Sequence, residues 1–440
     1  MSGLARYFAS VHRLRVCGYD RTPSPLTQAL EAEGMTIGYA DSVAWVESLG
    51  LSPRDTLVVR TPAVPADSAI FTYLREQGFD ISKRAEVLGL VTRSKQALCV
   101  AGTHGKTTTS TMIAHLLNND GVNAFLGGIS MNYNTNVLIA PKSDFVVVEA
   151  DEYDRSFHQL TPYISVITAV DPDHLDIYGT PEAYREAFEH YTSLITGALV
   201  MKQGLPIQPR LQQGVKCYTY GMDNAKNIRI SDGQIVFDYV SPLATIKGIR
   251  LGVPVWVNIE NAVAAITVAL LVGADAGQIK ERVASFRGVQ RRFNCHVNTP
   301  EVVYIDDYAH HPDEIATSID SVRRLYPERR LVGVFQPHLF TRTRDFADGF
   351  ARVLATLDEV VLLPIYPARE LPIAGVTSEM LAQRVREKGN EHVCVLEKSE
   401  LVEYLQKHVA ESREPLVVMT IGAGDIDRLV EPLTEALRHE

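Results

Sequence analysis

The stretch AGTHGKTTT, residues 101–109, decides the fold of this 440-residue chain. The apolar run ALCV (97–100) before it has the composition of a buried strand, and the run STMIAHLL (110–117) after it has the pattern of a helix. A glycine-rich turn between a strand and a helix lets backbone N–H groups and the helix N-terminus point at phosphate oxygens. The stretch therefore predicts a phosphate-binding loop in an α/β domain.

The loop supplies a cation and hydroxyl groups for a nucleotide. Lys106 is predicted to neutralise phosphate charge, and Thr107 to offer its hydroxyl to Mg²⁺. Only two residues separate the glycines, against four in the usual GxxxxGK[ST] pattern, so a glycine-rich turn with a solvated lysine is the alternative. With a strand and a helix in place we prefer the phosphate loop, in which the nucleotide is held by Gly102, Thr103, His104, Gly105, Lys106, Thr107 and Thr108.

Two clusters of polar residues follow later apolar runs. Glu149 and Asp151 come after FVVV, and Asp173 and His174 come after ISVITAV. In a parallel sheet both clusters fall at the edge that carries the loop, where one or two carboxylates can keep Mg²⁺ on a nucleotide. Each cluster alone is also typical of a solvated turn. We predict Glu149 as a metal ligand, and His174, as a neutral imidazole, as a ligand of a second ion.

The chain as a whole alternates short apolar runs with helical segments, which is typical of α/β folds with a mostly parallel sheet. Between about 200 and 255 the short runs VKCYTYG and GQIVFDYV predict a small antiparallel flap, and the strand-helix alternation starts again after about 297. We therefore predict three domains, at 1–94, 95–296 and 297–440.

The composition is that of a globular protein without a basic surface. The net charge of -10 and the pI near 5.8 argue against nucleic acid or an anionic membrane as a partner, since both favour clustered Lys and Arg. The five widely spaced cysteines show no metal-ligand spacing. No apolar stretch of about 18 residues and no charged-then-apolar leader is found, so we expect a cytoplasmic protein without a membrane span.

The chain opens with MSGLARYFAS (1–10), whose amphipathic pattern predicts a helix, followed by a strand at 14–17 and a turn at 18–20. A nucleotide-binding βαβ unit normally has a strand and a glycine-rich turn before such a helix, and an acidic residue where Asp20 stands. The pattern fits a domain that starts on a helix, or one without its first strand.

Several motifs together closely resemble those of the Mur ligases, over nearly the whole chain. The motifs are AGTHGKTTT, VEADEYDRSF, DPDHLDIYG, FRGVQRRF, DDYAHHPDEI, FQPHLFTRT and GAGDI. The resemblance implies an α/β fold of three domains: a Rossmann-like N-terminal domain for a UDP-sugar, a central ATPase domain with a mostly parallel sheet, and a Rossmann-like C-terminal domain that closes over the site.

The resemblance also implies an amide ligase of peptidoglycan precursor synthesis that uses ATP and Mg²⁺. DDYAHHP with FQPHLFTRT favours the members that phosphorylate the lactyl carboxylate of UDP-N-acetylmuramate, whose acyl phosphate is then attacked by the amino group of L-alanine. A recycling ligase that attaches a whole tripeptide to the same sugar nucleotide ranks second. A non-catalytic alternative is a protein that binds a nucleotide and acts as a switch. We expect a monomer or a weak homodimer.

The resemblance implies roles for the residues near the phosphates and the metal ions. Lys106 and Thr107 would serve the phosphates and the first Mg²⁺, and Glu149 and His174 a second Mg²⁺ that bridges to the acyl phosphate. Arg292 resembles the family arginine near the γ-phosphate.

A second set of residues would contact adenine. Asn258 and Asn261 resemble the pair that opens a helix beside the base, although Trp256 and Val257 stand where the family usually has a histidine before the first Asn.

The remaining residues belong to the C-terminal part of the chain. Asp307, Tyr308 and His310 resemble residues that close on the nucleotide and the amino acid, whereas His338 and Arg342 resemble those facing the reacting carboxylate and alanine. Leu339 stands where many members have Arg. No general base stands out, and both His338 and a phosphate oxygen are candidates.

Relatives carry a strand and a GxGGxG turn before the residues MSGLA, with which this chain begins. We therefore expect an N-terminal domain whose first strand position is open or filled by another segment, and weak binding of the UDP-sugar. A start assigned at an internal methionine is the preferred explanation, and a chain boundary chosen by design is the other.

Overall fold

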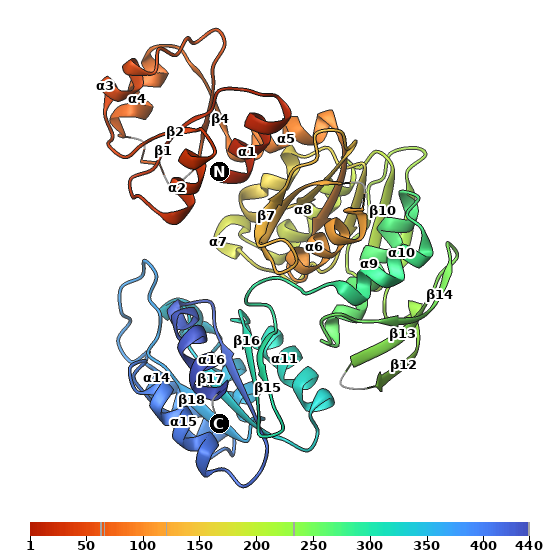
Figure 1. Cartoon of the computed structure of the whole chain (residues 1–440), viewed down its shortest axis with the longest axis vertical. Helices are drawn as coiled ribbons and strands as arrows, with labels where there is room; N and C mark the ends of the chain where they lie inside the picture. Colours follow the sequence, from red (N-terminus) through yellow and green to blue (C-terminus); the bar gives the residue numbers. More distant parts are fainter. Residues whose placement is uncertain (62–63, 66, 120, 232–233, 439–440) are drawn as a thin grey trace. The chain divides into compact units, whose positions relative to one another are not determined.

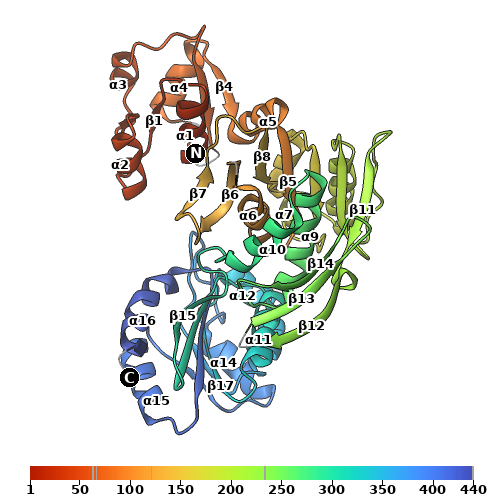
Figure 2. The same ribbon diagram turned by 45° about the vertical axis from the view of Figure 1, so that its right-hand side comes forward.

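A computed structural model describes residues 1–61, 64–65, 67–119, 121–231 and 234–438. The chain divides into two compact units, Met1–Asp223 with Val263–Ile279, and Asn224–Ala262 with Lys280–Glu440. Figure 1 labels many of the elements of both units, and Figure 2 shows the chain from a second direction. The boundaries of the three predicted domains stay a prediction.

The first unit contains the phosphate-loop motif. Its helices are α1 (Ser2–Val11), α2 (Pro25–Ala32), α3 (Val43–Ser48), α4 (Ala69–Glu76), α5 (Arg84–Ser94), α6 (Lys106–Leu117), η1 (Tyr153–Gln159), α7 (Leu175–Tyr178), α8 (Pro181–Thr192) and η2 (Met222–Asn224, which ends in the second unit). Its strands are β1 (Cys17–Tyr19), β2 (Thr36–Gly38), β3 (Leu57–Arg60), β4 (Asp80–Lys83), β5 (Gln96–Ala101), β6 (Asn123–Ser130), β7 (Thr135–Leu138), β8 (Phe145–Glu149), β9 (Ile164–Ile167), β10 (Ala198–Lys202) and β11 (Lys216–Tyr220).

The N-terminal region is built on two small sheets. β1 pairs in parallel with β2, and β3 pairs in parallel with β4, and within the described residues no strand connects the two pairs. Val46, Ile70 and Leu74 form a small buried core. The open or otherwise filled position of the first strand stays a prediction, whereas α1 confirms the helix predicted for the first ten residues.

The strand that follows α1 begins later than predicted. β1 pairs with β2 from Cys17, opposite Thr36, so Gly18 and Tyr19 belong to the strand and not to a turn. Leu14 is 56% exposed, and the pairing with β2 begins only at Cys17. The apolar run at 14–17 therefore predicted a strand correctly, but the predicted limits of that strand were wrong.

Seven strands form the central sheet, in the order β11-β10-β9-β5-β8-β6-β7. All neighbours are parallel except β6 and β7. β5, β8 and β9 are apolar and almost wholly buried, as expected for central parallel strands covered by helices, and α5 and α6 both contact β5. β11, predicted as part of the antiparallel flap, is instead a parallel edge strand, and its alternating pattern reflects an exposed outer side.

The second unit contains the remaining elements. Its helices are α9 (Val257–Leu271, which continues into the first unit), α10 (Ala276–Ser285, which begins in the first unit), α11 (Pro312–Leu325), α12 (Phe340–Asp345), α13 (Ala347–Leu354), α14 (Ser378–Glu387), α15 (Leu401–Glu411), η3 (Asp425–Leu429) and α16 (Val430–Arg438). Its strands are β12 (Ala225–Ser231), β13 (Gln234–Val240), β14 (Thr245–Arg250), β15 (Asn294–Asn298), β16 (Val302–Asp307), β17 (Arg330–Phe335), β18 (Glu359–Leu362), β19 (Val393–Val395) and β20 (Leu416–Ile421).

Two sheets organise the second unit. β12, β13 and β14 form an antiparallel sheet, which confirms the flap predicted for this part of the chain. The larger sheet has the order β15-β16-β20-β17-β18-β19 and is parallel except at β15. Polar residues follow β16, β17 and β20, so they meet at one edge of this sheet. In the described part of the chain, no helix is both long and apolar enough to cross a membrane.

Candidate nucleotide and ligase site

The phosphate loop leaves the middle of the central sheet. It follows β5, whose two neighbours β8 and β9 carry the polar clusters at their ends. Gly105 takes φ +80 and caps the N-terminus of α6, where Lys106 and Thr107 form the first turn. The structure therefore places the loop and both clusters at the carboxyl edge of three adjacent parallel strands, as predicted from the sequence.

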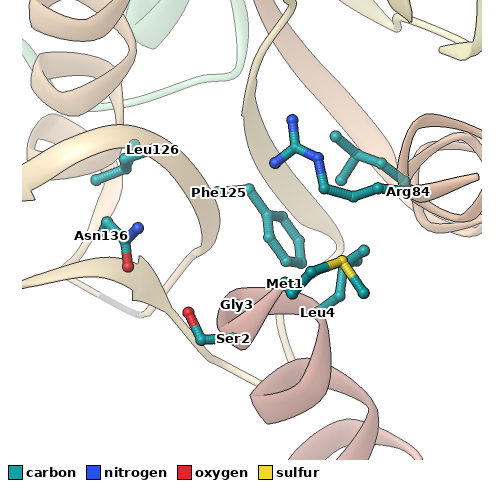
Figure 3. A pocket seen from close by; sticks show the side chains of 9 residues that line it. Met1, Ser2, Gly3, Leu4, Arg84, Phe125, Leu126 and Asn136 are labelled. Carbon is teal, nitrogen blue, oxygen red and sulfur yellow. The ribbon is translucent and has the colours of Figure 1, made fainter. Parts of the chain in front are cut away.

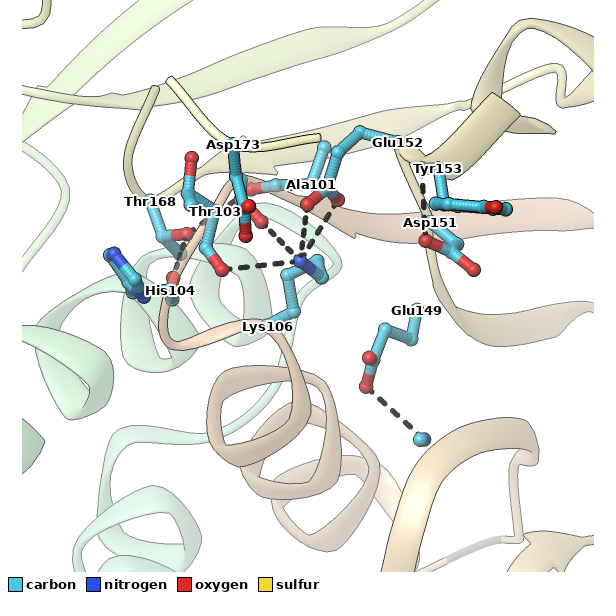
Figure 4. Close-up of polar contacts among 12 residues, drawn as sticks. Ala101, Thr103, His104, Lys106, Glu149, Asp151, Glu152, Tyr153, Thr168 and Asp173 are labelled. Carbon is cyan, nitrogen blue, oxygen red and sulfur yellow. Dashed lines mark hydrogen bonds and ion pairs between the residues drawn. The ribbon is translucent and has the colours of Figure 1, made fainter. Parts of the chain in front are cut away.

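Gly102 fits a backbone position that no other residue can take without strain. It has φ +138, and a Cβ there would overlap the Thr168 hydroxyl and the backbone of Ala169. The Thr168 hydroxyl donates a hydrogen bond to the His104 carbonyl, which ties the loop to the end of β9 (Figure 4). The turn is thus a close approach of two backbone segments.

Thr103 is held by a second set of contacts. Its hydroxyl donates to the Asp171 carbonyl at 2.7 Å and lies 2.8 Å from the Tyr184 hydroxyl on α8. Together with Thr168 these bonds hold the loop in one shape before any phosphate arrives, which lowers the entropy lost on binding.

Lys106 turns back over the loop toward Glu152 (Figure 4). Its ammonium lies 2.9 Å from the Glu152 carboxylate and donates to the Gly102 carbonyl at 2.5 Å. Burial raises the pKa of Glu152, and the Lys106 charge opposes that rise. A phosphate that reaches this ammonium must therefore compete with a protein carboxylate.

Glu149 lies apart from that ion pair (Figure 4). One of its oxygens accepts the Gly127 backbone N–H at 3.1 Å, and a Cβ at Gly127 would overlap its carboxylate. His174 caps α7 with φ +53, its Nε2 lies 3.7 Å from Asp173, and its ring meets Tyr153 edge to face.

The oxygen donors of this edge fit Mg²⁺. The Glu149 carboxylate and the Thr107 hydroxyl are hard ligands of the kind that Mg²⁺ takes beside substrate phosphates. Within the described residues no group of three or more His, Cys, Asp or Glu is placed to hold a metal alone. A site with one or two protein ligands is thus what this edge offers.

The predicted adenine residues lie in the second unit. Asn261 donates its side-chain N–H to the Asn258 side-chain oxygen at 3.0 Å, and Asn258 donates to the Val253 carbonyl at 3.3 Å. Both side chains are buried. The structure thus brings the pair together at the start of α9.

A cluster of imidazoles and arginine follows β17. His338 stacks on Tyr366, with ring centres 5.6 Å apart, and its Nδ1 lies 3.3 Å from an Arg342 guanidinium nitrogen. Burial lowers the pKa of His338 to about 4, with Arg342 and His310 acting in the same direction. His310 is 6.4 Å away between ring centres. His338 is therefore neutral at physiological pH.

Arg292 lies close to residues that follow and end β16. The guanidinium of Arg292 lies 5.1 Å from the centre of the Tyr308 ring. Asp307 is buried and accepts a hydrogen bond from the Ser318 hydroxyl. Burial raises the pKa of Asp307, and the Ser318 bond and the Arg292 charge oppose that rise.

Relatives of known name match this chain over its full length. Family models for the Mur ligase middle domain and the Mur ligase glutamate ligase domain match residues 100–269 and 291–424. UDP-N-acetylmuramate--L-alanine ligase of Phocaeicola vulgatus is 55% identical over 438 residues, 98% of this chain and 94% of the relative. The enzyme of the same name from Porphyromonas gingivalis W83 is 51% identical over 448 residues, 100% and 96% of the two chains.

The chain belongs to the Mur ligase family. Among solved structures, UDP-N-acetylmuramate-alanine ligase MurC of Thermotoga maritima matches with TM-score 0.75 and 27% identity, over 99% of this chain and 96% of that one. A murein peptide ligase of Psychrobacter arcticus has TM-score 0.61 and 22% identity, over 99% and 96%, which shows the shared fold. The predicted α/β Mur ligase fold is thus confirmed.

This Mur ligase contains polar partners that its sequence did not single out. Glu152 stood in an acidic cluster, but nothing in the spacing marked it as the partner of Lys106. Glu370 is distant along the chain, yet its carboxylate accepts the Thr341 N–H at 3.0 Å and its hydroxyl at 2.5 Å, beside His338 at the start of α12. The only feature of the sequence that could have indicated Glu370 as a partner is its charge in a loop that follows a strand.

Leu339, which we expect to stand where many Mur ligases have Arg, has an unusual backbone conformation. It has φ +68, a value rare for a residue with a branched side chain, and its N–H donates to the Tyr366 carbonyl at 2.9 Å. Its side chain brings no charge to the cluster, so Arg342 is left as the arginine that faces His338.

Replacing Gly102 by Ala is expected to abolish ATP binding, because the methyl group would overlap Thr168 and Ala169. Gly204→Ala is the matched control, since Gly204 has φ +83 but nothing within 4 Å of a Cβ. That control should lose about 1 kcal/mol of folding free energy and keep its affinity. Calorimetric titration with ATP compares the two, and an unchanged affinity in Gly102→Ala would refute the close approach.

Replacing Arg342 by Gln is expected to raise the pKa of His338 above its value of about 4, because one nearby cation is removed while burial remains. Proton NMR titration of the assigned imidazole measures the change. Arg344→Gln is the control, since Arg344 is exposed and paired with Asp345 at 2.7 Å. A pKa that does not move in Arg342→Gln contradicts the contact with Arg342.

Proposed function

We propose that this protein joins L-alanine to the lactyl carboxylate of UDP-N-acetylmuramate and converts ATP to ADP and phosphate. The observation that carries the proposal is the 55% identity, over 98% of this chain and 94% of the relative, to a ligase of that name. The murein peptide ligase matches at 22% identity and supports the fold alone, so attachment of a tripeptide ranks below L-alanine.

In the first step, a lactyl carboxylate oxygen attacks the γ-phosphorus of ATP, ADP leaves, and an acyl phosphate forms. Gly102, Gly105 and the first turn of α6 supply backbone N–H groups to the phosphates, and Lys106 supplies the cation after it leaves Glu152. Arg292 would neutralise the γ-phosphate.

Mg²⁺, when bound, would screen the phosphate charge and hold the oxygens in line. Thr107 would hold the first ion, and Glu149 and His174 a second one. A Thermotoga maritima MurF structure described as a complex with ADP has this fold, with TM-score 0.62 and 17% identity. ATP and Mg²⁺ are the cofactors we propose.

In the second step, the amino group of L-alanine attacks the acyl carbon, the amide bond forms, and phosphate leaves. His338 and Arg342 would bind the anionic oxygens of the reacting groups, because both present N–H donors. Asn258 and Asn261 would contact adenine, and Asp307 the nucleotide.

The N-terminal region is the proposed site of the UDP-sugar. A small pocket lies beside the first turn of α1 (Figure 3). Arg84 of α5, Phe125 of β6 and Asn136 of β7 line it together with Ser2 and Leu4. An arginine, an amide and a helix N-terminus are suitable groups for a phosphate or a sugar hydroxyl.

The cytoplasm is the proposed location, because ATP and a UDP-sugar are available there and the cysteines form no disulfide in the described residues. A monomer or a weak homodimer, with neither nucleic acid nor membrane as a partner, is the proposed state.

Phosphate release is expected only when UDP-N-acetylmuramate, L-alanine and ATP are all present, and to fall by at least about 100-fold in Lys106→Ala, because the cation at the phosphates is lost. A coupled phosphate assay measures the rate. Lys142→Ala, which removes an exposed lysine of the same unit, is the control and should keep the rate. Release from ATP alone at the full rate points to a different activity.

L-alanine is expected to be used in preference to the tripeptide when both are offered at equal concentration with UDP-N-acetylmuramate. Mass spectrometry of the product mixture distinguishes the two amides. A mixture dominated by the tripeptide product would instead identify a recycling ligase, and nucleotide binding without either product would indicate a switch.

A further inference from the structure

The segment that presents Arg292 is held in an unusual backbone conformation. Arg291 has φ +61 and Phe293 has φ +55. Both values lie in the left-handed region, which residues other than glycine rarely adopt. Such conformations persist only where the surrounding structure holds them. The contacts of Arg291 identify what holds this segment.

Arg291 is tied to two strand ends of the C-terminal sheet. Its carbonyl accepts the Tyr308 N–H at 2.6 Å, and its guanidinium donates to the Gly422 carbonyl at 2.7 Å. The same guanidinium lies 3.9 Å from the Asp306 carboxylate and 3.5 Å from that of Asp427. Both its main chain and its side chain are therefore fixed by residues at the ends of β16 and β20.

Asp306 is the buried member of this group of contacts. It is 1% exposed, and it accepts a hydrogen bond from the Thr420 hydroxyl at 3.1 Å. Burial raises the pKa of Asp306 to about 6, while Arg291 and the Thr420 hydroxyl oppose that rise. At pH 7.5 the carboxylate is thus ionised and pairs with Arg291, whereas Asp427 is 46% exposed and screened by water.

The position of Arg292 depends on the same contacts. The guanidinium carbons of Arg291 and Arg292 lie 5.0 Å and 5.1 Å from the centre of one ring, that of Tyr308. Two cations this close to one ring need separate counter-charges. Asp306 serves Arg291, and Asp307, next along β16, interacts with Arg292.

We propose that Asp306 is a positioning residue which, through Arg291, fixes the segment that presents Arg292 to the nucleotide. This inference rests on the proposed role of Arg292 at the γ-phosphate. Asp306 itself touches no substrate in this assignment. Without the Asp306 carboxylate, the positive charge of Arg291 is less well neutralised beside that of Arg292. The segment then relaxes, and Arg292 loses its alignment with the nucleotide.

A double-mutant cycle in the full chain tests this coupling. Asp306→Asn, Arg292→Ala and the double variant are assayed for kcat and KM for ATP by phosphate release at pH 7.5. We expect Asp306→Asn alone to lower kcat/KM for ATP about tenfold. In the Arg292→Ala background the same substitution should lower kcat/KM less than about twofold, because the effects of residues that act through one another do not add. Asp348→Asn, which breaks an exposed pair with Arg384, should leave kcat/KM unchanged.

The outcomes separate this inference from the proposed role of Arg292. Equal losses from Asp306→Asn in both backgrounds would overturn the positioning role and leave Arg292 in place. No loss from Arg292→Ala would overturn both. If Asp306→Asn unfolds below the assay temperature, as thermal melting would detect, Arg291→Lys replaces it in the cycle. The same dependence on Arg292 is then expected, and additivity again overturns the proposal.

Discussion

The close approach of Gly102 to the end of β9 is the constraint on which the phosphate site depends. The backbone turns at φ +138 against the Thr168 hydroxyl and the backbone of Ala169, where a Cβ has no room. Because β5 lies between β8 and β9, this turn directs the loop between the polar residues that follow both neighbours. The bonds from Thr103 and Thr168 then hold the loop, so Lys106 begins α6 at a defined place. One steric requirement thus positions the cation and the helix N-terminus beside those polar residues.

Pairing of cations with buried carboxylates is the second feature common to both units. Lys106 faces Glu152 in one unit, and Arg291 faces Asp306 in the other. Burial raises the pKa of both carboxylates, and the cation in each pair opposes that rise. A buried pair is costly to break when only one partner is removed, since the other charge is left without compensation. In the proposed reaction, a phosphate at Lys106 would therefore have to replace Glu152 as the partner of the ammonium. Arg291, by contrast, is also held by the Gly422 carbonyl and lies close to Asp427, so several contacts hold the segment before Arg292.

The sequence predicted the parts of this site that depend on local pattern. Apolar runs and glycine spacing predict the loop, the strand before it and the two later strands whose ends carry the polar clusters. The structure places all of them as expected. Contacts between distant residues were not predictable. Asp306 and Asp307 appear in the sequence as one acidic pair, yet successive side chains of β16 point to opposite faces, one toward Thr420 and the other toward Ser318. β1 was placed too early because its limits depend on pairing with β2, and the apolar pattern does not contain that pairing.

Hydrogen bonds in the C-terminal cluster also restrict which group accepts the proton of the attacking amine. Arginine has only donors, so the bond between Arg342 and His338 requires an unprotonated Nδ1 and leaves the hydrogen of the neutral ring on Nε2. His338 then offers an N–H to substrate, and with a pKa of about 4 it is a weak base at neutral pH. His310 has the opposite tautomer, because its Nδ1 donates to the Tyr308 carbonyl at 3.0 Å and its Nε2 keeps the lone pair. Burial also lowers the pKa of His310. In the proposed reaction, His338 is therefore better suited to orient the anionic oxygens of the acyl phosphate than to take the proton of the amine.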